Sequence, residues 1–462
     1  MSFLDNIIYN LPEVSSPTQK RLSFKEKAKW TLIVLVIFFV LGLIPLYGLG
    51  HNALQQFEAL SVILGASFGS IISLGIGPIV TASIVLQLLN GSGLVKFDMQ
   101  SSEGKKRFTG VQKLLSVFFI VFESSIYVFM GGLAPDPALA GTALYFQLEL
   151  LLVFQLFLGG SLIMLLADVI DKWGFSQGIS LFIAAGVSQT IFVRMLSPLK
   201  SDSGFGAYVG AIPQMIYSVA TQDPQSAVLA LSAALATVIV FVLAVYAQSM
   251  KIEIPLSFGR VRGQGIRWPL SFIYTSNIPV ILVAALLANI QLWARLLERW
   301  GHPILGTFIG NTPATGIVSW LYAPNVVGKI IQGSFSTHDI IPAVFYMIIM
   351  ICGAVVFSIF WVQTSGMDAK SQADNIMSSG LQMPGFRRDP RVLERVLDRY
   401  IGPLTVMGAI SVGILAGLAD LTGAFGNGTG ILLSVMIIYK LYEEIAKQHM
   451  MDMHPMMRKF ME

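Results

Sequence analysis

The sequence predicts an all-α polytopic membrane protein with ten transmembrane helices. Of its 462 residues, 54% are hydrophobic and only 12% are charged, whereas soluble domains carry about 25% charged residues. Ten apolar runs are long enough to cross a bilayer, because a spanning helix needs about 20 mostly apolar residues. Lys and Arg gather in alternate loops, as they do in membrane proteins of fixed orientation.

Composition also excludes several classes of protein. Intrinsically disordered chains, coiled coils and nucleic-acid binders need far more charge than this chain carries. The single cysteine, Cys352, excludes an intramolecular disulfide framework and a cysteine-based metal cluster. The formal net charge of +4 gives no argument for an acidic partner by itself.

Residues 1–29 are predicted to be a cytoplasmic N-terminus. Five basic residues precede the first apolar run, which is too long for a cleavable signal peptide: Lys20, Arg21, Lys25, Lys27 and Lys29. The spacing of Phe3, Ile7 and Leu11 is typical of an amphipathic helix on the membrane surface. The alternative is a frayed terminus.

The ten spans define two halves. They are predicted near 30–49, 74–95, 111–133, 146–169, 178–196, 226–248, 270–292, 339–364, 401–421 and 428–445. An N-terminal half (30–196) and a C-terminal half (226–445) flank an external loop (197–225), and a tail (446–462) follows. An even number of spans puts both termini on one side. Because 25 of the 30 Lys and Arg residues lie on that side, it is predicted to be the cytoplasm, across the cell membrane.

Residues 57–70, FEALSVILGASFGS, are apolar but too short to cross a bilayer. We expect a re-entrant half-helix, which membranes tolerate only inside protein or along an aqueous cavity. An interfacial loop is the alternative.

Two spans open alike, with GIGPIV (75–80) and SNIPVI (276–281). Each is the second span of a five-span half and has a proline just inside its start. Interrupted spans at corresponding positions indicate an inverted repeat with a functional path between the halves.

No catalytic constellation is present. The sequence has no HExxH, G-x-S-x-G or P-loop motif, and its five histidines lie outside the predicted spans. We therefore expect no enzymatic activity, cofactor or bound metal. Glu123 is the clear ionisable residue at membrane depth, and Glu149, Asp168, Asp420 and Lys440 lie near span ends. Glu123 is a candidate functional residue, and a structural hydrogen bond between helices explains it equally well.

Two cytoplasmic loops, 249–269 and 365–400, carry a cluster of arginines: Arg260, Arg262, Arg267, Arg387, Arg388, Arg391, Arg395 and Arg399. Such a surface suits phosphate backbones or acidic protein. The positive-inside bias alone is the other explanation for any single arginine.

Several segments, in order, resemble the archaeal branch of a known family. They are PEVSSPTQKRLSFKEKAKW (12–30), SLGIGPIVTASIVLQLL (73–89), ISLFIAAGVSQTIFV (179–193), SNIPVILVAALLANIQLW (276–293), GFRRD (385–389) and GTGILLSV (428–435). The chain resembles SecY, the channel-forming subunit of the heterotrimeric protein translocon. The resemblance implies an hourglass pore between two five-helix halves, which moves unfolded polypeptides and releases apolar segments into the lipid.

The resemblance also implies site residues. The apolar pore ring would be Ile76, Val80, Ile179, Ile183, Ile281 and Leu433. The polar cluster of a lateral gate would be Thr81, Glu123 and Asn289. By position, a plug helix would include Phe57, Leu60, Ile63, Leu64 and Phe68. Docking of a ribosome or cytoplasmic motor would involve Arg260, Arg262, Arg387 and Arg388.

The implied partners are small SecE-like (gamma) and Secβ-like membrane subunits, the ribosome or a motor, signal sequences and nascent chains. Two other interpretations of the function remain. An inverted-repeat secondary transporter would need a small-solute site with several midplane charges or polar ligands. An intramembrane hydrolase would need a Ser/His, paired-Asp or metal constellation at membrane depth.

Overall fold

The structure is a computed structural model that describes residues 11–19, 22–50, 69–91, 93–95, 97, 101–199, 208–258, 265–309, 312–378, 381–382, 389–425 and 428–453. Ten long helices follow the order of the ten predicted spans: α2 (Phe24–Leu43), α4 (Gly77–Gly91), α5 (Ser102–Phe129), α6 (Ala143–Trp173), α7 (Gly178–Leu196), α9 (Pro224–Ser249), α10 (Ile278–Arg299), α13 (Ile340–Thr364), α15 (Pro390–Leu421) and α16 (Gly428–Met453).

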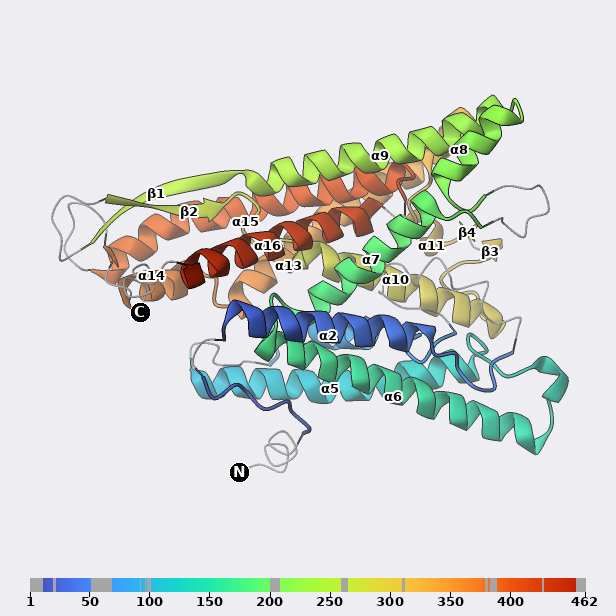
Figure 1. Cartoon of the computed structure of the whole chain (residues 1–462), viewed down its shortest axis with the longest axis horizontal. Coiled ribbons are helices and arrows are strands. Elements are labelled where there is room, and N and C mark those ends of the chain that lie inside the picture. Colours follow the sequence, from blue (N-terminus) through green and yellow to red (C-terminus); the bar gives the residue numbers. More distant parts are fainter. Residues whose placement is uncertain are drawn as a thin grey trace.

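Shorter elements connect the long helices. They are η1 (Pro137–Leu139), α8 (Ala211–Ala220), β1 (Lys251–Phe258), β2 (Gly265–Ser271), β3 (Phe308–Ile309), β4 (Thr312–Pro313), α11 (Ile317–Trp320), α12 (Val326–Ile331), η2 (Thr337–Asp339), α14 (Ala369–Ser378) and β5 (Leu381–Gln382). The long helices run along the long axis of the molecule (Figure 1). We call the end with β1, β2 and α14 the hairpin end, and the end with α8, β3 and β4 the loop end.

Within the described residues, seven helices are long and apolar enough to cross a membrane. Helix α4 is shorter. Helices α2 and α16 have apolar runs bordered by charges such as Lys29 and Lys440. All ten spans of the predicted fold thus have a helix, although composition alone selects seven.

Helix bounds differ from the predicted spans where local chemistry sets them. Helix α2 begins earlier because the Ser23 side chain accepts a hydrogen bond from the Glu26 amide, 3.4 Å. It ends before Pro45, whose ring disfavours helical backbone in the preceding residue. Helix α10 begins at Ile278 rather than near 270, because residues 265–271 form strand β2. Apolar windows locate only the part of a helix that lies in lipid.

Small residues allow close helix packing. On α15, a Cβ at Gly413 would lie 2.9 Å from the Ile351 Cα of α13. A Cβ at Gly417 of α15 would lie 2.6 Å from the Sδ atom of Met347, which is also on α13. Since lipid is as apolar as leucine, such close contact rather than hydrophobic burial holds membrane helices together.

The two halves repeat one unusual turn. Gly75 has φ +55° and Ser276 has φ +58°, and α4 and α10 each begin two residues later with proline as the second helical residue. The Gly75 amide bonds the Ile72 carbonyl, 2.8 Å, and the Ser276 amide bonds the Ile273 carbonyl, 3.1 Å. Figure 1 shows α10, in yellow, beginning near the middle of the long axis. This correspondence is the structural form of the inverted repeat.

Candidate functional site

The six predicted ring residues lie at the beginnings of four helices. Ile76 precedes α4 directly and Val80 is in its first turn. Ile179 and Ile183 are in the first two turns of α7, Ile281 in the first turn of α10, and Leu433 in the second turn of α16. Each helix therefore contributes its N-terminal part.

These side chains belong to one apolar cluster. Ile76, Val80, Ile183, Ile281 and Leu433 are each at most 7% exposed, and Ile179 packs against the same cluster while partly buried. The cluster draws on both halves of the chain, since α4 and α7 come from one and α10 and α16 from the other. The structure thus brings the six residues into a common core between the halves.

Polar side chains join α4 and α10 beside this core. The Asn289 Nδ2 group donates to Thr81 Oγ1 at 2.8 Å, and Thr81 Oγ1 donates to the Gly77 carbonyl at 2.9 Å. The carboxyl of Glu123 on α5 is within hydrogen-bonding reach of Thr81. Glu123 is 6% exposed and Asn289 is 8% exposed. The three predicted gate residues therefore form one largely buried contact between the halves.

An aromatic contact extends this line of contacts. The rings of Phe122 on α5 and Trp293 on α10 lie 5.7 Å apart. We define the seam as the contact of α4 and α5 with α10 and α13. The contact of Thr81, Glu123 and Asn289 is polar, and the contact of Phe122 with Trp293 is aromatic.

All five predicted plug residues, from Phe57 to Phe68, lie outside the described part of the chain. The described chain on either side is joined at one point. The Leu46 amide bonds the Gly69 carbonyl, 2.8 Å, and the Ile71 amide bonds the Ile44 carbonyl, 2.9 Å. Residues 44–46 and 69–71 are therefore neighbours in the fold, directly before the turn that carries Ile76.

The four predicted docking arginines, Arg260, Arg262, Arg387 and Arg388, also lie outside the described residues. The loops that carry them are joined by a small sheet with strand order β2-β1-β5, in which Ser257 pairs with Gln382 and Phe258 with Leu381. A separate apolar core, including Ile254, Ile376 and Leu397, packs beneath the sheet. This sheet was not predicted from the sequence. Strand β5 is too short for a recognisable pattern, and the alternation of apolar residues along β1 is the signal that could have revealed the other two strands.

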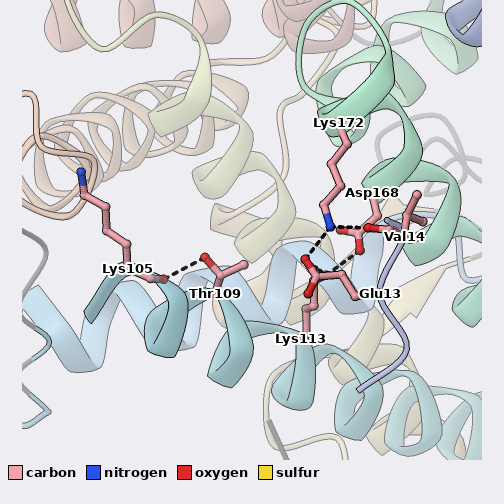
Figure 2. A network of polar contacts seen from close by, with 7 residues as sticks. All are labelled: Glu13, Val14, Lys105, Thr109, Lys113, Asp168 and Lys172. Atoms are coloured by element: carbon pink, nitrogen blue, oxygen red, sulfur yellow. Dashed lines mark hydrogen bonds and ion pairs between the residues drawn. The ribbon is translucent and has the colours of Figure 1, made fainter. Parts of the chain in front are cut away.

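A charged network at the hairpin end was also missed (Figure 2). Lys113 Nζ of α5 lies 2.5 Å from Asp168 Oδ2 of α6, and Lys172 Nζ lies 2.5 Å from Glu13 Oε1. The Trp173 indole also donates to the Ser15 carbonyl, 2.9 Å. The hydrogen bond from Lys172 lowers the pKa of Glu13 below its usual value. Opposite charges near the same end of neighbouring spans are the signal that could have revealed it.

Asp420 is a structural residue of the C-terminal half. Its carboxylate accepts from the Thr429 amide at 2.7 Å and from the Tyr346 hydroxyl at 2.6 Å. It therefore caps the start of α16 and ties it to α13. In the described part of the chain, no group of three or more His, Cys, Asp or Glu residues could hold a metal ion.

Known proteins resemble the chain over its whole length. The SecY family model matches residues 70–442, and the model of the plug domain of Sec61p matches residues 36–69. The protein translocase subunit SecY of Methanothermobacter thermautotrophicus is 44% identical, covering 98% of this chain and 96% of its own. The predicted plug segment begins inside the plug match and ends one residue beyond it.

Two solved structures share the fold. One, described as the structure of a protein-conducting channel, has a TM-score of 0.84 and 41% identity, covering 98% of this chain and 99% of its own. The other is Sec61 in a canine ribosome–channel complex from the endoplasmic reticulum, with a TM-score of 0.81, 39% identity and the same coverage. The chain, with its ten helices in two related halves, belongs to the SecY family.

Proposed function

We propose that the chain is the pore-forming subunit of a protein-conducting channel, and that the six ring residues are its constriction. One observation carries the proposal: six apolar side chains from the starts of four helices belong to one large apolar cluster that draws on both halves. The SecY relatives, with the described protein-conducting channel, support it. An inverted-repeat transporter of small solutes is not favoured.

The chemistry of the ring suits such a channel. A narrow apolar collar offers an ion nothing to replace its hydration shell, so the resting pore excludes ions. An unfolded polypeptide slides through because no polar group on the collar binds particular side chains. Branched aliphatic residues deform and reclose around a moving chain. Residues 57–70 act as a plug on the external side of this collar.

The seam is the lateral gate. A passing segment is sampled there between pore water and lipid, and apolar residues contribute roughly −0.3 to −0.6 kcal/mol each to insertion. Polar contacts between membrane helices contribute about 0.6–2 kcal/mol, which biases the seam shut without preventing its opening. Thr81, Glu123 and Asn289 therefore set how hydrophobic a segment must be before it leaves sideways.

The hairpin end is the cytoplasmic face, with both termini in the cytoplasm and the chain in the cell membrane. Arg260, Arg262, Arg387 and Arg388 dock a ribosome or a cytoplasmic motor, as the canine ribosome–channel complex suggests. Small SecE-like and Secβ-like subunits complete a heterotrimer. The chain is not an enzyme and needs no cofactor, so the energy for transport comes from outside the chain.

The gate assignment is tested with Asn289→Leu. This change removes the hydrogen bond to Thr81 and should shift the hydrophobicity threshold for membrane insertion of a graded series of test segments. The matched control is Asn375→Leu in α14, which lies outside the seam. An unchanged threshold in Asn289→Leu would contradict the gate assignment.

The docking assignment has its own test. Charge reversal, Arg387→Glu, should weaken ribosome binding, with the largest deficit at low salt, because counterions screen a phosphate contact. Normal binding at low salt would remove Arg387 from the interface.

A further inference from the structure

The seam carries a contact at the loop end that the gate residues do not explain. Arg299 is the last residue of α10, and its Nη1 group donates a hydrogen bond to the carbonyl of Gly131. Gly131 lies two residues beyond the end of α5. The bond therefore joins the C-terminal half to the N-terminal half across the seam.

The backbone of α5 prepares the acceptor. The Met130 amide bonds the Ile126 carbonyl and the Leu133 amide bonds the Tyr127 carbonyl, at 3.0 and 2.8 Å. Gly131 has φ +76°, the left-handed conformation in which glycine commonly ends a helix. The chain turns there, and the Gly131 carbonyl is left for a donor from outside α5.

Electrostatics favour a cation at this place. Helices α5 and α10 both run toward the loop end (Figure 1), and the bond between Arg299 and Gly131 places their C-terminal ends beside each other. The C-terminal end of each helix carries a partial negative charge of about half an electron, so two adjacent ends repel and a cation stabilises both. The guanidinium of Arg299 belongs to the last turn of α10 and is bound to the end of α5.

The contact lies against an apolar layer. Tyr127, Val128 and Leu133 from the α5 side pack with Leu292 and Leu296 of α10 in one cluster, and each is at most 3% exposed. In contrast, Arg299 itself is exposed. The layer keeps the helix ends together, and a solvent-accessible arginine at its edge is free to release when the helices separate.

We propose that Arg299 is a positioning residue of the lateral gate, a latch that holds the loop end of the seam closed. This inference rests on the proposed function of the seam. The gate is then held closed by two separate hydrogen bonds, one between Thr81 and Asn289 and one between Gly131 and Arg299. Opening the seam along its full length requires both to break.

The test measures the separation of the two helix ends in the reconstituted full-length channel. Spin labels are placed at Phe129 and Trp300, which are 48% and 67% exposed, in a Cys352→Ala background. Arg299→Gln should raise the population with separated ends by about twofold to fivefold, as expected for loss of a partly solvated hydrogen bond. Arg299→Lys, which keeps the cation, should give a smaller change.

Glu298→Gln is the matched control. Its carboxylate accepts from the Phe308 amide at 2.9 Å, a contact within the C-terminal half. Equal distance distributions in Arg299→Gln and Glu298→Gln would overturn the latch. The latch also predicts that Arg299→Gln lowers the hydrophobicity threshold for insertion.

Asn289→Leu separates failure of the latch from failure of the gate. If Asn289→Leu shifts the threshold and Arg299→Gln does not, the latch is wrong and the gate stands. If neither variant shifts it, the proposed gate function of the seam is wrong, and the latch fails with it.

Discussion

The turns that lead into α4 and α10 have the same backbone conformation, but they differ in the residue that adopts it and in how closely a neighbouring helix packs against them. In the N-terminal half, the left-handed residue is Gly75 and the covering residue on α6 is Gly159, which contacts the Ile71 carbonyl. In the C-terminal half, the left-handed residue is Ser276 and the covering residue on α15 is Gly408, which contacts the Phe272 carbonyl. Both turns place a predicted ring residue at the start of a helix.

The C-terminal turn is the more strained of the two. A non-glycine residue in the left-handed region costs about 1–3 kcal/mol, and Ser276 offsets part of this by donating to Asn277 Oδ1 at 3.0 Å. The Asn277 Nδ2 group is buried and has no hydrogen-bond partner in the described structure. The N-terminal turn is therefore the more tightly packed of the two and the C-terminal turn the more strained.

The largest expected effect is at Gly159. In Gly159→Ala the new Cβ would overlap the Ile71 carbonyl. Because this carbonyl belongs to the backbone, no side-chain rotation can relieve the clash. We expect the free energy of unfolding to fall by more than about 3 kcal/mol, the upper part of the range for overpacking. Denaturation of the detergent-solubilised channel measures it.

Gly430→Ala in α16 is the control for this change, because a Cβ at Gly430 would meet its nearest neighbour, the Val187 side chain, at an ordinary contact distance of 3.4 Å. It should be neutral or slightly stabilising, since alanine is a better helix former than glycine by about 1 kcal/mol. Equal stability of the two variants would contradict a tightly packed N-terminal turn.

A smaller effect is expected at Gly408. Its Cβ would lie 2.7 Å from the Phe272 carbonyl and 3.3 Å from the Ile273 Cα, so a modest shift of the turn relieves the clash. Gly408→Ala should cost about 1–3 kcal/mol. The same denaturation experiment measures it, and a greater loss than in Gly159→Ala would reverse the comparison.

Ser276→Gly should raise the free energy of unfolding, whereas the alanine substitutions at Gly159 and Gly408 lower it. Glycine adopts φ +58° without strain, although it also gives the unfolded chain more freedom. We expect a net stabilisation of about 1 kcal/mol or less, whereas Ser276→Ala, which keeps the strain and loses the hydroxyl, should destabilise. A destabilised Ser276→Gly would show that this turn is not strained.

The smallest expected effect on stability is at the hairpin end, where different segments pack over the two halves. The C-terminal half is covered by the sheet over its apolar core, and the N-terminal half by residues 11–19, held through the charged network. The folded-state pKa of Glu13 is lowered by Lys172. The stabilisation that ionised Glu13 provides is therefore fully present above the ordinary pKa of a glutamate, and it is lost as the pH falls through the lowered pKa.

Because Glu13 is 58% exposed, this contribution is below about 1 kcal/mol. A fluorescent label at Ser16 should report release of residues 11–19 as the pH falls below the ordinary pKa of a glutamate. In Glu13→Gln a larger fraction of residues 11–19 should be released at neutral pH, by up to about fivefold, and an identical pH profile in the variant would show that the ion pair does not hold the segment.

Much of the fold could be predicted because the bilayer imposes simple rules. Apolar length located the ten helices, and the family and the two-half architecture are confirmed. The paired prolines, Pro78 and Pro279, marked the repeated turns. The covering residues Gly159 and Gly408 could not be found, since one glycine among 43 carries no sign of the carbonyl that it meets.

The site was predicted less evenly. The contact between Thr81 and Asn289 agrees with the expected gate, although the roles of gate, ring, plug and docking residues stay predictions. Arg299 lies at the end of a helix, where a basic residue is ordinary, so its bond to the other half is visible only in three dimensions. The pairing of Lys113 with Asp168 likewise depends on how α5 and α6 align.

The central claim is that polypeptide passes through the ring, and crosslinking tests it most directly. A channel with Cys352→Ala and Ile179→Cys is paired with a ribosome-tethered translocating chain that contains one cysteine. The control channel has its cysteine at Val242, which is 57% exposed on α9. If polypeptide passes through the ring, a disulfide should form at position 179 only when the tethered chain is long enough to reach the ring. Absence of that disulfide at every chain length, with the complexes engaged, would contradict it.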